Sequence, residues 1–335
     1  MPDVIDAAFL VFLAAVGMSY VYAFVGGFTD AANAIATSVG TRAFTPGQAV
    51  LVAAIFEVLG ALTGTAVALT IGTGVVRTEF LTQGAVVAAL AGAMTWSLMT
   101  YRYGIPVSET HGLIGGILGV GLFYAGFEGV IWEGVIPVLL AIVLSPALGV
   151  LGGMGMYLLV QAVFSRVHRH AAMAWTRNLQ RLSAVYMAFS HGRNDAQKPM
   201  GVLTLALVVY LGLPSDHVPL WVVLSVGAVA GLGVAVGGWR IIRTLGMRIT
   251  GLDSAQGFAA ETSAATVLQI ASQAGIPVST THTITSAIVG VGTVSNWRSI
   301  RWTLVIDIVS SWMLTLPATI LFGFAYAALL RGILG

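Results

Sequence analysis

An internal repeat most constrains what this chain can fold into. The segment Gly104-Ile-Pro-Val-Ser-Glu-Thr-His111 recurs as Gly275-Ile-Pro-Val-Ser-Thr-Thr-His282, 171 positions later (275 − 104 = 171). A weaker echo relates residues 27–31 to residues 192–196, in the same order along the chain. Because such self-similarity means that one structural unit occurs twice, we expect two homologous halves, residues 1–165 and 182–335, joined by a basic linker at 166–181.

The composition decides what surrounds these halves. Apolar residues make up 57% of the chain, and Asp, Glu, Lys and Arg together only 8%. Soluble domains carry about a quarter charged residues, so this composition excludes a water-soluble enzyme, a nucleic-acid-binding protein and a disordered chain. With no cysteine, it also excludes a disulfide framework, a thiolate metal site and a cysteine nucleophile. We expect an all-α, multi-pass protein of the cell membrane, with the lipid bilayer as a partner and no nucleic acid.

The apolar runs predict ten to twelve membrane segments, because a bilayer core needs roughly 20 apolar residues per helix. Two runs are too long for one pass and contain Pro146 and Pro317, which predicts either long tilted helices or kinked ones. The candidate runs lie near residues 8–25, 47–71, 82–101, 131–163, 200–213, 219–239, 257–273 and 300–330.

Arginines indicate the orientation, since Lys and Arg collect in cytoplasmic loops. Four lie in the linker 166–181 and three in a second predicted loop at 240–248, while the connection 213–217 between them has none. Both basic loops are therefore expected in the cytoplasm, the linker as a solvated anchor rather than a nucleic-acid or lipid-headgroup site. Sequence alone leaves parallel and inverted halves open. Inverted repeats with a site at their interface are a common transporter plan, and we favour them.

Each repeated Gly-Ile-Pro-Val-Ser segment interrupts an apolar stretch. Proline disfavours helix before it and serine is a good N-cap, so we expect short re-entrant helices beginning at Ser108 and Ser279. Free amide N–H groups and the positive end of the helix dipole favour anions at such termini. The residues expected to bind an anion are Ser108, Thr110, Ser279, Thr280 and Thr281. The alternative is that these hydroxyls only bond to the backbone of kinked helices.

Asp30 and Asp195 occupy matching places in the weaker echo, inside apolar surroundings where an isolated charge is costly and usually functional. Carboxylate and amide oxygens suit Na⁺, and a carboxylate can also carry H⁺. A cation bound beside an anion lowers the cost of burying both, which makes their movement interdependent. The residues expected at this cation or coupling site are Asp30, Asn33, Asn194, Asp195, Gln197 and Glu261, with Na⁺ at Asp30 and Asp195.

The remaining polar residues have simpler expectations. His111 and His282 favour hydrogen-bonded structural roles over proton transfer, and His191 has the same two interpretations. Glu57 and Asp307 are expected to be structural hydrogen-bonding groups within the membrane. Arg193 and Lys198 flank Asp195, and either could pair with it or attract the anion.

Four motifs in order resemble the inorganic phosphate transporter (PiT) family over essentially the whole chain. They are residues 27–37 around Asp30, residues 190–201 around Asp195, residues 257–265 around Glu261, and the two Pro-Val-Ser-X-Thr-His segments. The resemblance implies a secondary symporter with inverted repeats that moves phosphate with Na⁺ or H⁺. It also implies that the two Asp motifs and the Ser and Thr residues of the short helices form the binding sites.

Three positions depart from the family pattern: Thr29 where Asn is usual, Glu109 where Ser or Thr is usual, and Arg193 where a small residue is usual. Thr29 changes the expected cation ligands of the first half. Glu109 places a carboxylate beside the expected anion cradle, as a selectivity or coupling group. The family also includes sulfate permeases. Near neutral pH phosphate can still donate a hydrogen bond and sulfate cannot, so an ionised Glu109 aimed at the anion would favour phosphate.

We therefore expect a cation-coupled phosphate symporter rather than an enzyme, with no cofactor beyond co-transported Na⁺ or H⁺. A sulfate permease with the same mechanism is the alternative. An intramembrane hydrolase using Ser108 and His111 is disfavoured because the pair recurs at Ser279 and His282, whereas hydrolysis needs one set. A passive anion channel would differ in not concentrating its substrate. The 41 glycines permit close helix contacts within or between protomers, which allows a homodimer.

Overall fold

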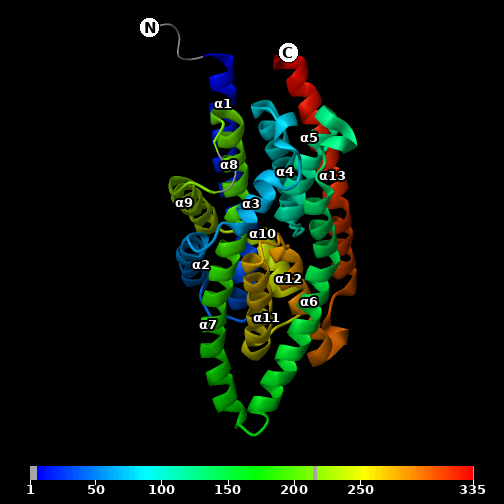
Figure 1. The fold of residues 1–335 in the computed structure, drawn as a ribbon. Coiled ribbons are helices and arrows are strands. Elements are labelled where there is room, and N and C mark those ends of the chain that lie inside the picture. The colour runs from blue at the N-terminus through cyan, green and yellow to red at the C-terminus, as the bar shows by residue number, and fades with distance from the viewer. Residues whose placement is uncertain (1–5, 214–216, 335) are drawn as a thin grey trace.

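The chain is a bundle of helices with no strand among the described residues, 6–213 and 217–334 of this computed structural model (Figure 1). The α-helices are α1 (Ala7–Gly40), α2 (Pro46–Ala61), α3 (Ala66–Thr73), α4 (Gln83–Tyr103), α5 (Glu109–Ala125), α6 (Trp132–Phe164), α7 (Arg169–Asp195), α8 (Gln197–Leu211), α9 (Leu220–Val236), α10 (Trp239–Arg243), α11 (Ser254–Gln273), α12 (Thr280–Asn296) and α13 (Trp302–Leu334). Short helical turns are η1 (Thr78–Phe80), η2 (Gly126–Gly129), η3 (Thr244–Arg248) and η4 (Trp297–Ser299).

The order of helices recurs along the chain with the spacing of the repeated motif. Helices α4 and α11 begin at residues 83 and 254, and α5 and α12 at 109 and 280, a shift of 171 in both cases. Helices of the first occurrence of this order pack on helices of the second. Helix α1 packs on α9 and α2 on α7, while α5 packs on α13 and α6 on α12. In Figure 1, α4 and α5 fill the upper part of the bundle and α11 and α12 the lower part.

Two glycines at matching places allow these exchanged contacts. A Cβ on Gly27 of α1 would lie 2.2 Å from the carbonyl oxygen of Ala230 on α9. A Cβ on Gly192 of α7 would lie 2.1 Å from the carbonyl oxygen of Glu57 on α2. Any larger residue would push the helices apart, so the glycines of the weaker echo are explained by close helix packing.

Each short helix follows a sharp break. Gly104, the residue directly after α4, has a left-handed φ of 70°, and Gly275 after α11 has a φ of 68°. Glycine adopts this conformation without the cost of a Cβ. The run expected at 47–71 is also broken, because α2 and α3 are bent by 75° around residues 62–65. Helix α9 and the α10–η3 segment are bent by 57°.

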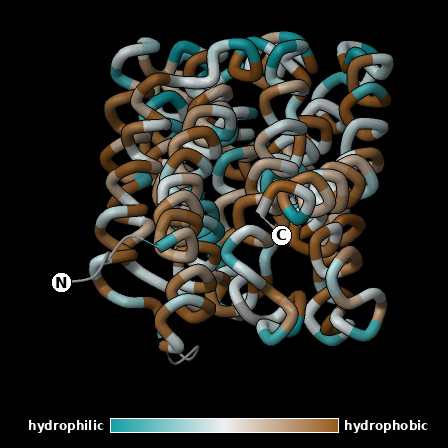
Figure 2. Tube along the Cα trace, turned by 90° about the horizontal axis from the view of Figure 1, so that it is seen from above, coloured by the Kyte–Doolittle hydropathy of each residue, from teal (hydrophilic) through white to brown (hydrophobic). Residues whose placement is uncertain are grey.

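Two of the three longest helices, α6 and α13, contribute much of the apolar exterior. Helix α1 has 34 residues, far beyond the expected run 8–25, and α6 and α13 have 33 residues each. Both α6 and α13 continue through their internal prolines. At 1.5 Å per residue, 33 residues reach about 50 Å, longer than a bilayer core. Hydrophobic residues predominate along the tube in Figure 2, and many large apolar side chains of α6 and α13 are exposed, as expected of a lipid-facing surface.

By length and composition, five helices of the described part could cross a membrane alone, or seven elements if each bent pair is one span. Helices α11 and α12 are not among these elements; α12 is short, and α11 carries many small polar residues. The count of ten to twelve segments therefore stays a prediction for the number of helices at membrane depth.

The basic linker differs from the expected loop. Only residues 165–168 connect α6 to α7, and the arginines from Arg169 onward lie on α7, because an alanine-rich segment favours helix. Arg177 and Arg181 donate to the carbonyls of Arg42 and Ala43. The second basic segment, 240–248, is also helical, as α10 and η3. Figure 1 shows the α6–α7 connection at the end opposite the start of α1 and the end of α13. Residues 214–216 of the expected connection 213–217 lie outside the described residues.

Candidate functional site

The first turns of α5 and α12 meet inside the bundle. The prediction that helices begin after Ser108 and Ser279 is confirmed: their hydroxyls cap the helices by accepting from the amides of His111 (3.2 Å) and His282 (3.1 Å). The hydroxyl of Thr110 on α5 donates to the carbonyl of Val278, just before α12, at 3.2 Å. Two positive helix ends therefore face each other across the halves.

The first-turn amides at these two termini are unused by the protein. Among the described residues, the N–H groups of Glu109 and Thr110 on α5, and of Thr280 and Thr281 on α12, donate to no hydrogen-bond acceptor. Free first-turn amides together with a helix dipole are suited to binding an anion.

Two of the five residues expected to bind the anion, Thr280 and Thr281, contact the acidic residues through their hydroxyls. Thr280 donates to Asp195 Oδ2 at 3.1 Å, and Thr281 points at Asp30 Oδ1 at 3.5 Å. The amide of Asn33 donates to Thr281 at 2.9 Å and to Thr280 at 3.3 Å. The two threonines of α12 thus link both carboxylates in one network, and they must change partners before they can donate to an anion.

Asp195 has basic or polar side chains close to both of its carboxylate oxygens. Lys198 Nζ lies 2.9 Å from Oδ1, and His191 Nε2 lies 3.2 Å from Oδ2, on the side that also receives the Thr280 hydroxyl. The other ring nitrogen of His191, Nδ1, is 2.7 Å from a carboxylate oxygen of Glu57. Glu57 therefore has the hydrogen-bonding role expected of it, in a buried row that runs from α2 through α7 to the site.

Asp30 is less completely satisfied. Its side chain is buried, with 4% exposed, and that of Asn33 has 1% exposed. Within the described chain, Asp30 Oδ2 and Asn33 Oδ1 have no hydrogen-bond partner. Ligand atoms of Asp30, His191 and Asp195 lie within 4.8 Å of one another, close enough to share a metal ion. Buried acceptors without partners are costly, so these oxygens are suited to a bound cation.

Asn194, the residue before Asp195, also lies at the site. Its amide contacts the Ser272 hydroxyl at 3.0 Å. With oxygen and nitrogen exchanged, the nitrogen donates to Asp195 Oδ1 at 3.1 Å and the oxygen accepts from Ser272. The exchanged orientation satisfies both atoms, and we adopt it. Asn194 then stabilises the Asp195 carboxylate.

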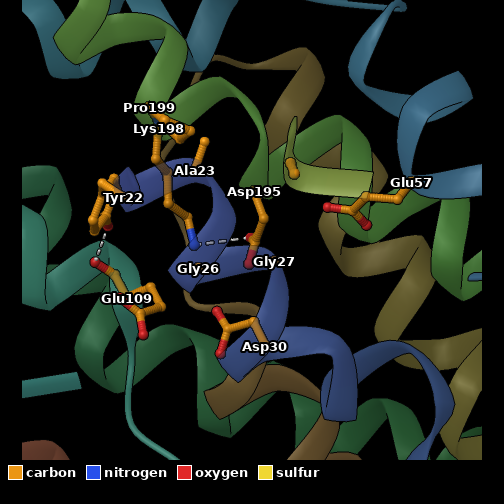
Figure 3. Close-up of a pocket in the computed structure, with 11 residues that line it drawn as sticks. Tyr22, Ala23, Gly26, Gly27, Asp30, Glu57, Glu109, Asp195, Lys198 and Pro199 are labelled. Atoms are coloured by element: carbon orange, nitrogen blue, oxygen red, sulfur yellow. Dashed lines mark hydrogen bonds and ion pairs between the residues drawn. The ribbon is translucent and has the colours of Figure 1, made fainter. Parts of the chain in front are cut away.

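Glu109 faces the same interior space. Its carboxylate accepts from Thr29 at 2.9 Å and from Ser97, and Tyr22 donates to its main-chain carbonyl at 3.2 Å. Figure 3 shows Glu109, Asp30, Asp195 and Lys198 around one cavity. That cavity measures about 20 Å³, room for little more than one water molecule. An oxyanion of the size of phosphate can enter only if helices or side chains move.

Several expected site residues lie elsewhere. The amide oxygen of Gln197 accepts from the amides of Val67 and Ala68, so it caps α3 rather than facing the carboxylates. Glu261 accepts from Thr37 and Ser183, both at 2.5 Å, in a separate buried cluster that joins α11 to α1 and α7.

Arg193 and Asp307 also lie away from the carboxylates. Of the two cations flanking Asp195, Lys198 pairs with it, whereas Arg193 donates to Gln269 at 2.8 Å. Asp307 is exposed on α13 and accepts from the Ser311 hydroxyl through its main-chain carbonyl. The structural hydrogen bond expected of its side chain is therefore not observed within the described part of the chain.

The two repeated histidines pack against aromatic rings, whereas the sequence predicts that they form hydrogen bonds. The rings of His111 and His282 are 4.9 Å apart, and His282 stacks on Trp312 at 4.0 Å. Neither ring nitrogen of His111 has a partner in the described residues. Sequence reasoning also missed Tyr22, Ser97 and Ser272, which lie in ordinary apolar or alanine-rich helices and carry no motif.

Comparison with known proteins decides the family. The model of a family described as "Phosphate transporter family" matches residues 26–323, a range that includes both carboxylates and both short helices. The chain belongs to the phosphate transporter family.

Relatives of the family cover nearly the whole chain. A "Probable low-affinity inorganic phosphate transporter" of Rhizobium meliloti is 42% identical, covering 94% of this chain and 95% of the relative. A protein with the same description from Bacillus subtilis is 37% identical, covering 90% and 91%. A solved structure described as "The sodium-dependent phosphate transporter" superposes with a TM-score of 0.89 at 28% identity, covering 97% of this chain and 100% of that one.

Membership of the family confirms the expected class of protein. The family and the fold are those of transporters, not enzymes, so the hydrolase interpretation of Ser108 and His111 is set aside. The matched descriptions name phosphate and give no support to the sulfate alternative. The apolar helices and the family together make this a multi-pass membrane protein.

Proposed function

We propose that this phosphate transporter family member is a secondary active symporter that moves inorganic phosphate together with Na⁺ or H⁺. The observation that carries the proposal is the meeting of the α5 and α12 N-termini beside two buried carboxylates. Such a site attracts an anion and a cation at the same time, and neither is easily buried without the other.

Phosphate would bind between the two helix ends. The four unused amides of Glu109, Thr110, Thr280 and Thr281 point to a ligand with several acceptor oxygens, which a tetrahedral oxyanion supplies. The hydroxyls of Ser108, Ser279 and the neighbouring threonines add donors without adding fixed charge. Glu109 would accept the hydrogen bond that a protonated phosphate donates and that sulfate cannot.

The coupling cation would bind on the first-half side, at Asp30 and Asn33. Their free buried oxygens are hard ligands of the kind that Na⁺ takes, and Asp30 could instead take up a proton. The superposed structure is that of a transporter described as sodium-dependent, which favours Na⁺. Partner exchange by Thr280 and Thr281, from carboxylate to phosphate, would make the two binding events interdependent.

Alternating access would follow from the two halves. We propose that residues 1–165 and 182–335 are inverted repeats, with residues 166–181 between them. The exchanged helix packing and the α5–α12 meeting at the centre support this arrangement, since transporters of this plan bind their substrate at the repeat interface. The small cavity corresponds to a closed site. We also propose that the arginine-rich α6–α7 end faces the cytoplasm of the cell membrane.

Uptake into proteoliposomes tests the proposal. The purified chain is reconstituted, and radiolabelled phosphate is followed under an inward Na⁺ gradient, an inward proton gradient, or neither. We expect phosphate to be concentrated inside the vesicles under one of the gradients only. Equal uptake in all three conditions, stopping at equilibrium, would establish a passive channel instead. Excess unlabelled sulfate in a parallel series should leave uptake unchanged, and full competition by sulfate would revive the permease alternative.

A further inference from the structure

In the repeat, a lysine of the second half corresponds to an asparagine of the first half. Asp30 matches Asp195 (195 − 30 = 165), and at the same shift Asn33 matches Lys198 (198 − 33 = 165). Lys198 is the single lysine of the sequence, because the other basic residues are arginines. The only primary-amine side chain of the chain therefore occupies the position where the first half carries a neutral amide at the site.

The structure shows what each residue does at its carboxylate. In the second half, the Lys198 ammonium reaches to 2.9 Å from Asp195 Oδ1, and the lysine is 2% exposed. In the first half, Asn33 brings no charge, and Asp30 Oδ2 and Asn33 Oδ1 have no partner within the described chain. In Figure 3, Lys198 extends toward Asp195, and the Asp30 carboxylate lies below both of them.

We propose that the ammonium of Lys198 is a resident counter-cation that takes the place of a mobile monovalent cation at the second-half carboxylate. The two carboxylates, whose ligand atoms lie within 4.8 Å of each other, are then neutralised in different ways. The seat at Asp195 is filled by a covalently tethered charge, and the seat at Asp30 and Asn33 takes a cation from solution. This inference rests on the proposed function, since it states how many cations can accompany each phosphate through these two seats.

The physical argument is one of charge and geometry. An ammonium is a compact, strongly solvated point charge with three donors, unlike the planar guanidinium of arginine. Next to a buried carboxylate it supplies the neutralisation that a bound Na⁺ would give. It cannot leave with the substrate, so it neutralises Asp195 in every state of the transport cycle and contributes nothing to coupling.

A second difference between the halves adds a carboxylate to the same cavity. Glu109 stands where the second half has Thr280 (280 − 109 = 171), which adds one carboxylate. Glu109 and Lys198 line the same cavity. Relative to a symmetric site with Asn and Thr at these positions, the chain has therefore gained one negative and one positive charge. Glu109 has its own hydrogen-bond donors, Thr29 and Ser97, so the Lys198 ammonium remains the partner of Asp195.

Equilibrium binding of ²²Na⁺ to the purified chain with saturating phosphate tests the inference. Lys198→Asn restores the residue of the other half, and we expect it to bind one Na⁺ more per chain than the wild type. Lys198→Arg keeps a tethered charge, and we expect no gain. The overturning results are an unchanged Na⁺ number in a monodisperse Lys198→Asn protein, or the same gain in Lys198→Arg.

A second variant keeps the inference testable if Lys198→Asn does not fold. Asn33→Lys places a tethered ammonium in the first half, and we expect this protein to lose the Na⁺ that the wild type binds there. Retention of that Na⁺ would overturn the inference. The outcome is separable from the proposed function: a wild type that accumulates no phosphate refutes symport, whereas a wild type that does, with the same Na⁺ number in Lys198→Asn, refutes only the tethered cation.

Discussion

Thr29 on α1 donates a hydrogen bond of 2.9 Å to the carboxylate of Glu109 at the start of α5. These are two of the three positions at which the chain departs from the pattern it resembles. Ser97 of α4 donates to the same carboxylate oxygen. The two departures therefore form one local feature: the Thr29 hydroxyl donates to the carboxylate that Glu109 adds.

Glu109→Gln should weaken the preference for phosphate over sulfate. The carboxylate only accepts hydrogen bonds, whereas the amide of Gln offers a donor that an unprotonated sulfate can use. The penalty of one mismatched buried hydrogen bond is about 1–3 kcal/mol, so the phosphate-to-sulfate affinity ratio should fall about tenfold. Competition of sulfate against labelled phosphate measures it. A ratio equal to that of the wild type would remove Glu109 from the anion site.

Asp30→Asn should abolish most cation-driven uptake, because it removes the one formal charge of the proposed mobile-cation seat. We expect a loss of about 100-fold in initial rate at low Na⁺, the size of a buried charge interaction of about 2–5 kcal/mol. Asp307→Asn is the matched control: the same chemical change on the exposed face of α13 should alter the rate less than about twofold. Similar losses in both variants would contradict a specific role for Asp30.

Ser279→Ala should lower both stability and phosphate affinity. The serine caps α12 through His282, and loss of an N-cap costs about 1 kcal/mol. Ser279→Asn keeps a capping oxygen, so its thermal unfolding should resemble that of the wild type. Unfolding is followed in detergent with and without phosphate. A lower unfolding midpoint for Ser279→Asn than for Ser279→Ala would show that Ser279 does not stabilise the protein by capping α12.

Local chemistry made much of this site predictable. Ser108 and Ser279 follow Pro-Val, and a proline followed by a capping serine identifies a helix start without knowledge of tertiary structure. Asp30 and Asp195 are conspicuous because an isolated carboxylate is rare in an apolar chain. The sequence does not predict the bend at residues 62–65, because these four residues contain only Leu, Thr and Gly and no charged side chain.

Tertiary contacts decided what could not be predicted. Gln197 was expected at the cation site from its nearness to Asp195 in sequence, yet the amides of Val67 and Ala68, 130 and 129 residues away, determine its orientation. Glu261 likewise finds its partners on α1 and α7. Nothing local distinguishes a residue that faces a ligand from one that caps a distant helix.

Gly27→Ala should destabilise the fold. The added methyl would lie 2.2 Å from the Ala230 carbonyl oxygen, and overpacking of this kind typically costs about 1–3 kcal/mol. Gly17→Ala, on the same helix with nothing within 4 Å of its Cβ, should be neutral or slightly stabilising, because alanine favours helix over glycine. Midpoints of thermal unfolding compare the two. Equal midpoints would mean that α1 and α9 can separate freely at this contact.

The dependence of phosphate binding on cations tests the central claim most directly. Isothermal titration of the purified protein with phosphate, in Na⁺ and in choline buffer and at two pH values, gives four dissociation constants. We propose that an anion at the N-terminal ends of α5 and α12 is balanced by a cation at Asp30. Phosphate should then bind at least about tenfold more tightly when the coupling cation is abundant. For Na⁺ coupling this is the Na⁺ buffer, and for H⁺ coupling it is the lower pH. Four equal constants would contradict the central claim.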